Sequence, residues 1–438
     1  MKNTFVISCP IDTFSGYGSR SRDFVKSIID LDKYDVKILP QRWGSTPMGF
    51  IENNPKWEFL NKHIIGPQLT EKPDIWCQVT VPNEFQQVGK YNIGLTAGIE
   101  TTACAPQWIE GCNRMDLILT SSEHSKKVFE QTVYQAKHKD TGQTHDLKLT
   151  KPIKVLIEGA DLDLYKPLPL TELKEDSIKS NLNSIKEDFA YLFVGHWMQG
   201  SMGEDRKNLG LLIKAFYEIF KNKKKVPALI LKTSTSGSSY LDRREIQKRI
   251  KLIRDTVPSK ILPNIYVLHG EFTDTEMNEI YNHPKIKSMV SLTKGEGFGR
   301  PLLEFSLTNK PIITTGWSGQ IDFLNPEFTV LLPGTLENIH PSAQVKDMLI
   351  EGSQWFSVSQ EKVGYYLNDV FDNYKDYKVK GKRQGYFSRT NFSFDKMKEQ
   401  LDEILTSSIP DFPKQVELKL PKLNKIKLPK LKKVETNG

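Results

Sequence analysis

The sequence lacks the signatures of several common classes of protein. Its four cysteines (Cys9, Cys77, Cys104 and Cys112) do not show the paired spacing of a zinc site, and their small number favours a reduced, intracellular setting. No run approaches the roughly 18 consecutive apolar residues that indicate a membrane span. The first residues, MKNTFVISCP, are too short and polar for a signal peptide and predict a strand. We therefore expect a cytoplasmic protein, with a peripheral membrane position or a viral origin in a host cytoplasm left open.

Little net positive charge remains outside the C-terminal tail. The net charge of the chain is +8, and residues 414–438 contain eight lysines and two glutamates, so the rest of the chain is nearly neutral. The tail holds a near-repeat, LPKLNKIK (420–427) followed by LPKLKKVE (428–435), whose regular prolines exclude a long helix. We expect a disordered tail that is either solvated without a partner or an electrostatic contact for nucleic acid or an anionic membrane.

At 438 residues, the chain is long enough for two domains of about 150 residues or more. Strand-like and helix-like segments alternate in both halves, which predicts an α/β fold with parallel sheets flanked by helices. A proline-containing segment with a shift in charge separates the halves and is typical of a linker. We predict an N-terminal domain (1–168), a linker (169–187), a C-terminal domain (188–385), a closing helix (386–408) and a disordered basic tail (409–438).

The most informative stretch is KGEGFGRPLLEF, residues 294–305. Pro301 suits the first turn of a helix, and two glycines allow a sharp bend before it. Backbone N–H groups at a helix start favour anions, and Glu296 and Glu304 offer hydroxyl acceptors on either side. This arrangement fits a nucleotide sugar, which has hydroxyls at both ends and phosphates in the middle. A plain turn and surface helix is the alternative, but the flanking strand-like segments favour a βαβ unit, which binds ligands beyond its strand ends.

Five segments, in the expected order, resemble the retaining glycosyltransferases of the GT-B fold, family 4 (group 1 glycosyltransferases). The last of them carries the two glutamates, separated by seven residues, of that family's signature. The resemblance spans about residues 1–408 and implies two Rossmann-like domains facing across a cleft, with a C-terminal helix closing the fold. The segments are SGYGSRSR (15–22), DLILTSSEHSKKVF (116–129), VLIEGADLDLYKP (155–167), FVGHWMQGSMGEDRKNLGLLIKAF (193–216) and EGFGRPLLE (296–304).

The resemblance implies a role for each matching residue. Glu304 would bind the ribose hydroxyls of the donor nucleotide, and Glu296 would contact the donor sugar near its reacting face. Lys207 would neutralise the departing diphosphate, because a fixed cation stabilises charge that develops in the transition state. Further donor contacts, through the backbone or a close approach of the chain, are implied for Gly297, Phe298, Gly299, Gly16 and Gly18.

The chain departs from the family pattern at two places. His196 stands where the family usually has an arginine, and a neutral imidazole is a weaker phosphate partner, so Arg206 would supply the missing charge. Many members have a histidine near the segment that reads LTAGIETT (95–102) here. Glu100 is the nearest polar candidate, either to orient or deprotonate the acceptor hydroxyl or to cap a helix.

No metal site and no cofactor is expected. Asp161-Leu162-Asp163 has the spacing with which other glycosyltransferases hold Mn²⁺ or Mg²⁺, but it falls in a segment that the family resemblance already explains. His138 and His145 lie in a polar stretch without further ligands, which we expect to be an exposed loop.

The sequence thus predicts a metal-independent retaining glycosyltransferase that uses a nucleotide sugar. The acceptor is left open among a glycan, a lipid and a modified nucleobase. One alternative is an enzyme that glycosylates hydroxylated bases of phage DNA, for which the basic tail is the sequence support. A second alternative is a non-catalytic carbohydrate-binding protein of the same fold.

Overall fold

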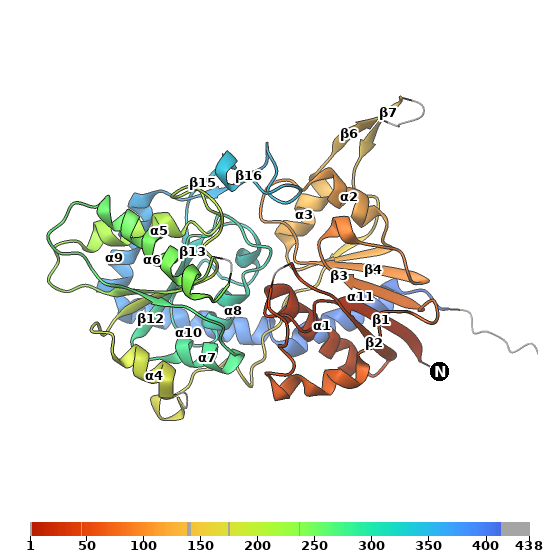
Figure 1. Ribbon diagram of the computed structural model, residues 1–438, viewed down its shortest axis with the longest axis horizontal. Coiled ribbons are helices and arrows are strands. Elements are labelled where there is room, and N and C mark those ends of the chain that lie inside the picture. Colours follow the sequence, from red (N-terminus) through yellow and green to blue (C-terminus); the bar gives the residue numbers. More distant parts are fainter. Residues whose placement is uncertain (1, 45, 138–141, 174–175, 236, 413–438) are drawn as a thin grey trace, which may run out of the picture.

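The computed structural model describes residues 2–44, 46–137, 142–173, 176–235 and 237–412. Two α/β domains lie side by side (Figure 1), each built on a six-stranded parallel sheet, as the alternating pattern predicts. Residues 413–438, on which most of the predicted basic tail falls, lie outside the described residues. Of the helices described, none is both long and apolar enough to cross a membrane.

The sheet of the N-terminal domain has the strand order β2-β1-β3-β4-β5-β8. Its strands β3 and β5 are buried along their whole length, which is typical of a parallel sheet covered on both faces. The elements of this domain are β1 (Asn3–Cys9), α1 (Gly16–Asp30), β2 (Tyr34–Pro40), η1 (Pro55–His63), β3 (Ile75–Val79), η2 (Pro82–Glu84), β4 (Tyr91–Thr96), α2 (Pro106–Asn113), β5 (Leu117–Thr120), α3 (Glu123–Gln131), β6 (Tyr134–Lys137), β7 (Thr144–Leu147) and β8 (Ile153–Val155).

The sheet of the C-terminal domain has the order β11-β10-β9-β12-β13-β14. Helices cover both of its faces, so that the apolar core forms two layers. The elements that follow β8 are η3 (Leu170–Glu172), α4 (Asp176–Asn183), β9 (Ala190–Val194), α5 (Leu209–Phe220), β10 (Ala228–Lys232), α6 (Tyr240–Asp255), β11 (Ile265–Leu268), α7 (Asp274–Asn282), β12 (Ile286–Ser291), α8 (Arg300–Ser306), β13 (Ile312–Thr315), η4 (Gly319–Asp322), β14 (Val330–Leu332), β15 (Thr335–Asn338), η5 (Pro341–Ala343), β16 (Gln354–Ser357), α9 (Gln360–Asp372), α10 (Tyr374–Asn391) and α11 (Phe394–Ser408).

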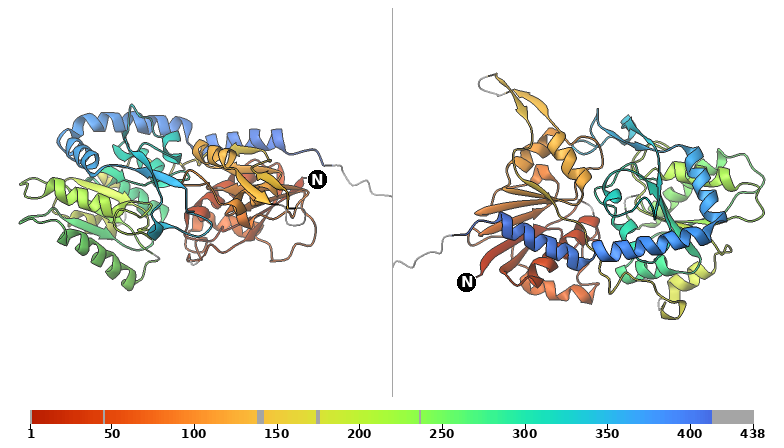
Figure 2. Two further views of the ribbon diagram at one scale, coloured as in Figure 1. Left: turned by 90° about the horizontal axis from the view of Figure 1, so that it is seen from above. Right: turned by 180° about the vertical axis from the view of Figure 1, so that it is seen from behind.

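The last two helices tie the domains together. Helix α10 packs against α8 in the C-terminal domain, whereas α11 returns to the N-terminal domain and packs against α1. Figure 2 shows the pair running along the back of both domains. Helix α11 buries apolar residues at helical spacing, including Met397, Leu401 and Leu405, in the core beneath β1. A C-terminal helix that closes the fold is therefore confirmed, but the range 386–408 expected for it also takes in the end of α10 and the break before α11.

The chain crosses between the domains twice, and the two crossings lie against each other. The Ala160 N–H donates to the Phe392 carbonyl at 2.9 Å, and the Phe394 N–H donates to the Ala160 carbonyl at 2.8 Å. The segment assigned to the linker also contains α4, whose Ile178 and Leu182 are buried in the core of the C-terminal domain.

Two hairpins extend from the sheets. The polar stretch expected to be an exposed loop, residues 137–151, contains β7 and the last residue of β6, which pair as an antiparallel hairpin that projects from the N-terminal domain (Figure 1). His138 and the rest of the stretch up to residue 141 lie outside the described residues. The expected exposure is confirmed, but the strand β7 was missed because its residues are mostly polar and almost wholly exposed. The second hairpin, β15–β16, reaches the other domain, where Thr102 and Gln354 exchange hydrogen bonds of 2.9 Å.

Candidate active site

The signature loop lies between β12 and α8, at the carboxyl edge of the C-terminal sheet. Pro301 is in the first turn of α8, as the sequence predicts. Gly299 precedes the helix with φ +99°, a left-handed conformation that residues with a side chain rarely adopt. The strand and helix therefore hold the loop at the place where a parallel sheet binds ligands.

This loop touches the N-terminal domain with no space for side chains. A Cβ added to Gly295 would lie 1.9 Å from the carbonyl oxygen of Glu100, and a Cβ added to Gly297 would lie 2.2 Å from that of Ala97. Both carbonyls belong to the segment that follows β4. Glycine is needed at these two positions because the backbones of the two domains meet there.

Four of the residues proposed from the sequence lie together at this contact. Lys207 forms an ion pair with Glu296, and Arg206 Nη1 lies 3.3 Å from Glu296 Oε2. The same nitrogen of Arg206 lies 3.5 Å from Glu100 Oε1, across the domain boundary, and donates to the Gly295 carbonyl at 2.8 Å. Two cations and two carboxylates, drawn from both domains, thus form one charged cluster.

Burial and charge work against each other in this cluster. Burial raises the pKa of the Glu296 carboxyl, but Lys207 and Arg206 outweigh it and hold the pKa below its usual value. Burial also lowers the pKa of Lys207, although Glu296 opposes the shift. Glu296 is therefore ionised and held firmly by two cations, which makes it an orienting group rather than a free nucleophile.

Glu304 lies in a second cluster on α8. Its Oε1 accepts a hydrogen bond of 2.9 Å from Arg300 Nε, and its Oε2 accepts one of 3.2 Å from the Tyr281 hydroxyl. Burial raises the pKa of Glu304 to about 7, although Arg300 opposes the shift. The carboxyl group therefore titrates near neutral pH.

Arg300 joins this second cluster to the N-terminal domain. Its Nη1 forms an ion pair with Asp23 of α1 and lies 3.8 Å from Glu158 Oε2, in the segment after β8. Sequence reasoning missed Arg300, Asp23, Glu158 and Tyr281. Arg300 lies inside the signature itself, where a charged residue directly before a helix-starting proline was a usable signal. Its partners in the other domain, Asp23 and Glu158, are far away in the sequence.

His196 follows β9, and its exposed ring lies among cations. Its Nδ1 lies 2.8 Å from the Ser234 hydroxyl. The partial withdrawal of the ring from water lowers the pKa of His196, and nearby Lys232 and Lys207 lower it further. The imidazole is therefore neutral near pH 7, and the positive charge beside it comes from its neighbours.

Of the remaining predicted donor contacts, Gly16 faces open space, whereas Gly18 and the Phe298 side chain are packed within their own domains. A Cβ on Gly16 would meet open space, whereas one on Gly18 would lie 2.3 Å from the Thr13 carbonyl, so Gly18 serves the packing of the first turn of α1. The Phe298 side chain packs against Phe323 in the core, with ring centroids 4.8 Å apart. Phe298 therefore has its backbone, and not its ring, to offer a ligand.

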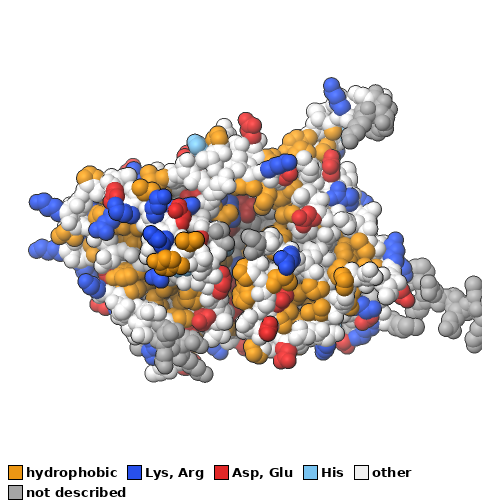
Figure 3. All heavy atoms as spheres, viewed as in Figure 1, with side chains coloured by type: hydrophobic (Ala, Val, Ile, Leu, Met, Phe, Trp, Pro, Cys, Tyr) orange, Lys and Arg blue, Asp and Glu red, His pale blue; other side chains and the backbone are white. Residues whose placement is uncertain are grey.

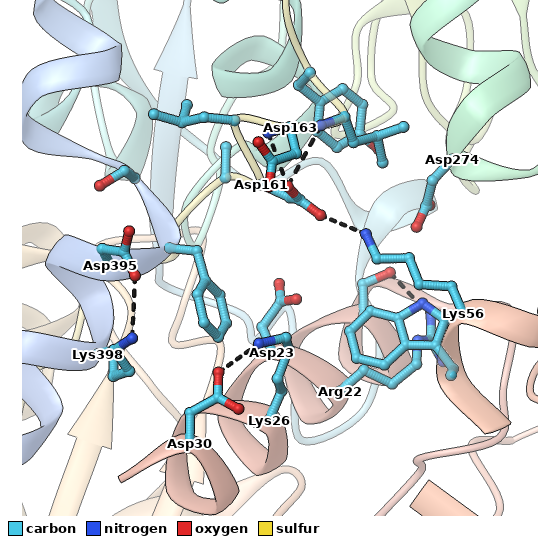
Figure 4. Close-up of a pocket in the computed structure, with 18 of the residues that line it drawn as sticks. Arg22, Asp23, Lys26, Asp30, Lys56, Asp161, Asp163, Asp274, Asp395 and Lys398 are labelled. Carbon is cyan, nitrogen blue, oxygen red and sulfur yellow. Dashed lines mark hydrogen bonds and ion pairs between the residues drawn. The ribbon is translucent and has the colours of Figure 1, made fainter. Parts of the chain in front are cut away.

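A groove runs between the domains in the space-filling view (Figure 3). A cavity of about 450 Å³ lies where the domains meet near the chain crossings (Figure 4). Arg300, Asp23 and Asp274 line it, together with Trp57 and the segment 160–165, whereas Glu296, Lys207 and Glu304 do not. This cavity is thus distinct from the Glu296 cluster, and Arg300 lies at its wall.

The aspartate pair considered as a metal site lies at a crossing between the domains. Among the residues that the structure describes, no group of three or more His, Cys, Asp or Glu side chains is placed to hold a metal ion. In the Asp161-Leu162-Asp163 segment, Asp161 forms an ion pair with Lys56 and accepts the Asp163 N–H at 3.0 Å. The charges of this segment therefore stabilise the crossing between the domains.

Comparison with solved structures identifies the fold. A glycosyltransferase from Rickettsia africae is 14% identical with a TM-score of 0.61, over 94% of this chain and 100% of that one. HepE of Anabaena, in complex with UDP and glucose, is 12% identical with a TM-score of 0.59, over 92% of this chain and 100% of that one. Sucrose-phosphate synthase from Thermosynechococcus elongatus is 11% identical with a TM-score of 0.58, over 93% of this chain and 99% of that one.

These similarities extend over nearly the whole of each chain, so the expected GT-B fold is confirmed. The sequence identities are low, and no protein-family model and no curated protein matches the chain.

Proposed function

We propose that the protein is a retaining glycosyltransferase, related to family 4, that moves a sugar from a nucleoside diphosphate to an acceptor hydroxyl. One observation carries this proposal. Lys207 and Arg206 are held by Glu296 and Glu100 at the point where the signature loop of one domain meets the other domain. The similar structures support it, because HepE was solved with UDP and glucose.

The donor would lie across the start of α8. Glu304 would accept the ribose hydroxyls, and the backbone around Gly297 would face the diphosphate or the sugar. Lys207 and Arg206 would provide the positive charge, so that the reaction needs no metal ion. Their ion pairs with Glu296 hold both cations in place before the donor arrives, and a preorganised cation is worth more in a buried site than in water.

The chemistry would follow from the absence of a free nucleophile in this cluster. Both cations engage Glu296, and its lowered pKa makes it a poor attacking group. The acceptor oxygen would therefore attack the sugar from the face that the diphosphate leaves. The bond from the anomeric carbon to the phosphate oxygen breaks as the acceptor bond forms, and the acceptor proton passes to the departing phosphate. Glu100, at the N-terminal side, would orient the acceptor hydroxyl.

The proposal is tested by a thermal-shift screen of the full-length protein against nucleotide sugars and free nucleotides. Stabilisation grows with ligand concentration relative to the dissociation constant, so the preferred donor should raise the melting temperature most. With that donor and no acceptor, slow release of the nucleoside diphosphate is expected. A protein that binds the donor but releases no nucleotide would be a carbohydrate-binding protein, and one that is stabilised by none of the ligands would contradict the proposal.

The pH dependence of nucleotide affinity should report on Glu304. Its pKa is raised to about 7, so the carboxyl is protonated below that pH and loses acceptor capacity for the ribose hydroxyls. We expect affinity for the nucleoside diphosphate to fall as the pH is lowered from about 8 to 6, measured by isothermal titration calorimetry. Glu304→Gln should bind weakly at every pH and lose this dependence. An unchanged pH profile in the variant would contradict the assignment.

A further inference from the structure

Arg300 occupies an unusual position for a single cation. It is the first residue of α8, and its guanidinium contacts three carboxylates. Glu304 belongs to its own helix, whereas Asp23 and Glu158 belong to the other domain. The charged groups are poorly exposed, because the side chains of Arg300, Asp23 and Glu158 are 19%, 11% and 8% accessible. Salt and water screen such charges much less than they screen surface ion pairs.

Apart from the Arg206–Glu100 ion pair in the Glu296 cluster, two polar contacts across the domain boundary are of a weaker kind. The Glu123 N–H donates to Asp322 Oδ2 at 2.8 Å at an exposed position, and Thr102 and Gln354 exchange neutral hydrogen bonds. Exposed and neutral contacts exchange readily with water, whereas separating a buried cation from its carboxylates leaves charge uncompensated. The Arg300 bridge therefore dominates the polar contribution to domain closure on its side of the groove.

The bridge lies close to the chain crossings. Arg300 lines the same cavity as residues 160–165 and 393–395, the segments through which the chain passes between the domains. Figure 4 shows Asp23 in this cavity together with Asp161, Asp163 and Asp395. Rotation of the domains about these segments would separate α8 from α1 and stretch the bridge. The bridge thus links the opening angle to the position of the Arg300 side chain.

We infer that Arg300 is a positioning residue that holds the domains closed and, through the same side chain, orients Glu304 for the donor. Arg300 Nε fixes one oxygen of Glu304, and the Tyr281 hydroxyl fixes the other. Opening the domains would pull on the guanidinium that orients this carboxylate. Domain closure and the proposed ribose contact are therefore coupled. The ribose contact rests on the proposed function, whereas domain closure by Arg300 does not.

The test separates the two halves of the bridge. In Asp23→Asn/Glu158→Gln the interdomain partners lose their charge while the Arg300–Glu304 pair remains. Cysteines introduced at the exposed residues Met48 and Met202, in different domains, can be spin-labelled selectively because the four native cysteines are buried. Without ligand, we expect the open-to-closed ratio from the distance distribution to rise at least about tenfold, as for the loss of a poorly screened charge pair. An unchanged distribution would overturn the inference.

Matched variants exclude a merely structural effect. Asp30→Asn removes a carboxylate of the same helix whose partner, Lys26, lies within the domain, and it should leave the distance distribution unchanged. Arg300→Met should open the domains, and Arg300→Lys should restore closure in part, since lysine keeps the charge without the fork geometry. Asp23→Asn alone, which is milder, should shift the distribution in the same direction if the double variant folds poorly. Opening by Asp30→Asn to the same extent would contradict the inference.

Binding of UDP distinguishes the two proposals. Asp23→Asn/Glu158→Gln should bind UDP within about threefold of the wild-type affinity if the C-terminal domain supplies the nucleotide contacts, since its Glu304 cluster is intact. Arg300→Met, which also frees Glu304, should bind it more weakly. Equal UDP affinity in both variants would overturn the coupling to Glu304. Domain opening in a protein whose wild type binds none of the nucleotides would leave the closure role standing and refute the proposed function.

Discussion

Replacing Lys207 by alanine should lower turnover at least about a hundredfold, within the range measured for a lost contact to developing charge. Lys207 is held by Glu296 in the charged cluster at the domain contact, where it would meet the diphosphate as it leaves. The charge on the leaving group grows most in the transition state, so the loss should appear in kcat more than in KM. Steady-state kinetics with the preferred donor measure it, and Glu296→Ala should show a loss of similar size because both cations lose their shared partner.

The matched control is Lys214→Ala, which removes a half-exposed lysine from α5, the helix that follows Lys207. Its turnover should stay within about twofold of the wild type, as for most surface substitutions. The free energy of unfolding of each variant should be measured, so that a loss of folded protein is not mistaken for a loss of chemistry. Near-wild-type kcat in both Lys207→Ala and Glu296→Ala would refute the assignment of the active site.

Replacing Gly297 by alanine should have an effect of comparable size through geometry alone. The new Cβ would lie 2.2 Å from the Ala97 carbonyl oxygen of the N-terminal domain, a distance that requires the backbones to move apart. The φ of Gly297 is not positive, so the C-terminal domain itself tolerates alanine. A displacement of about 1 Å between reacting groups costs on the order of a hundredfold in rate, so turnover should fall by about that factor.

Gly66→Ala is the control for this substitution, since a Cβ there would meet open space. It should leave turnover and the melting temperature unchanged. The Gly295→Ala variant should reproduce the Gly297→Ala effect, because its Cβ would lie 1.9 Å from the Glu100 carbonyl. If Gly297→Ala kept full turnover, the domains would not need the observed contact for catalysis.

Local sequence patterns predicted much of the fold. The buried, continuous apolar segments marked strands such as β9 and β10, because a strand covered on both faces has no polar side. The start of α8 was predicted from Pro301 and the glycine before it. The β6–β7 hairpin was not, since its strands are short and none of their residues is fully buried.

The site was predictable in part, for a related reason. Glu296, Lys207, Arg206 and Glu100 were each chosen from motifs, but no pattern stated which would touch which. The four lie on three segments, and the distances between their charged groups depend on how two domains are placed. Side-chain periodicity reports burial within one element and carries no information about that placement.

By itself, then, the sequence determined two alternating α/β domains, the loop and helix that carry the signature, and the residue types available for binding a nucleotide sugar. The tertiary structure alone decided that two glycines let the backbones of the domains touch, and that Arg300 binds Glu304 and two carboxylates of the other domain. The physical reason is the separation along the chain between the residues that interact. Helices, strands and turns follow from interactions between residues close in the chain, whereas ion pairs across a domain boundary depend on the packing of the whole molecule.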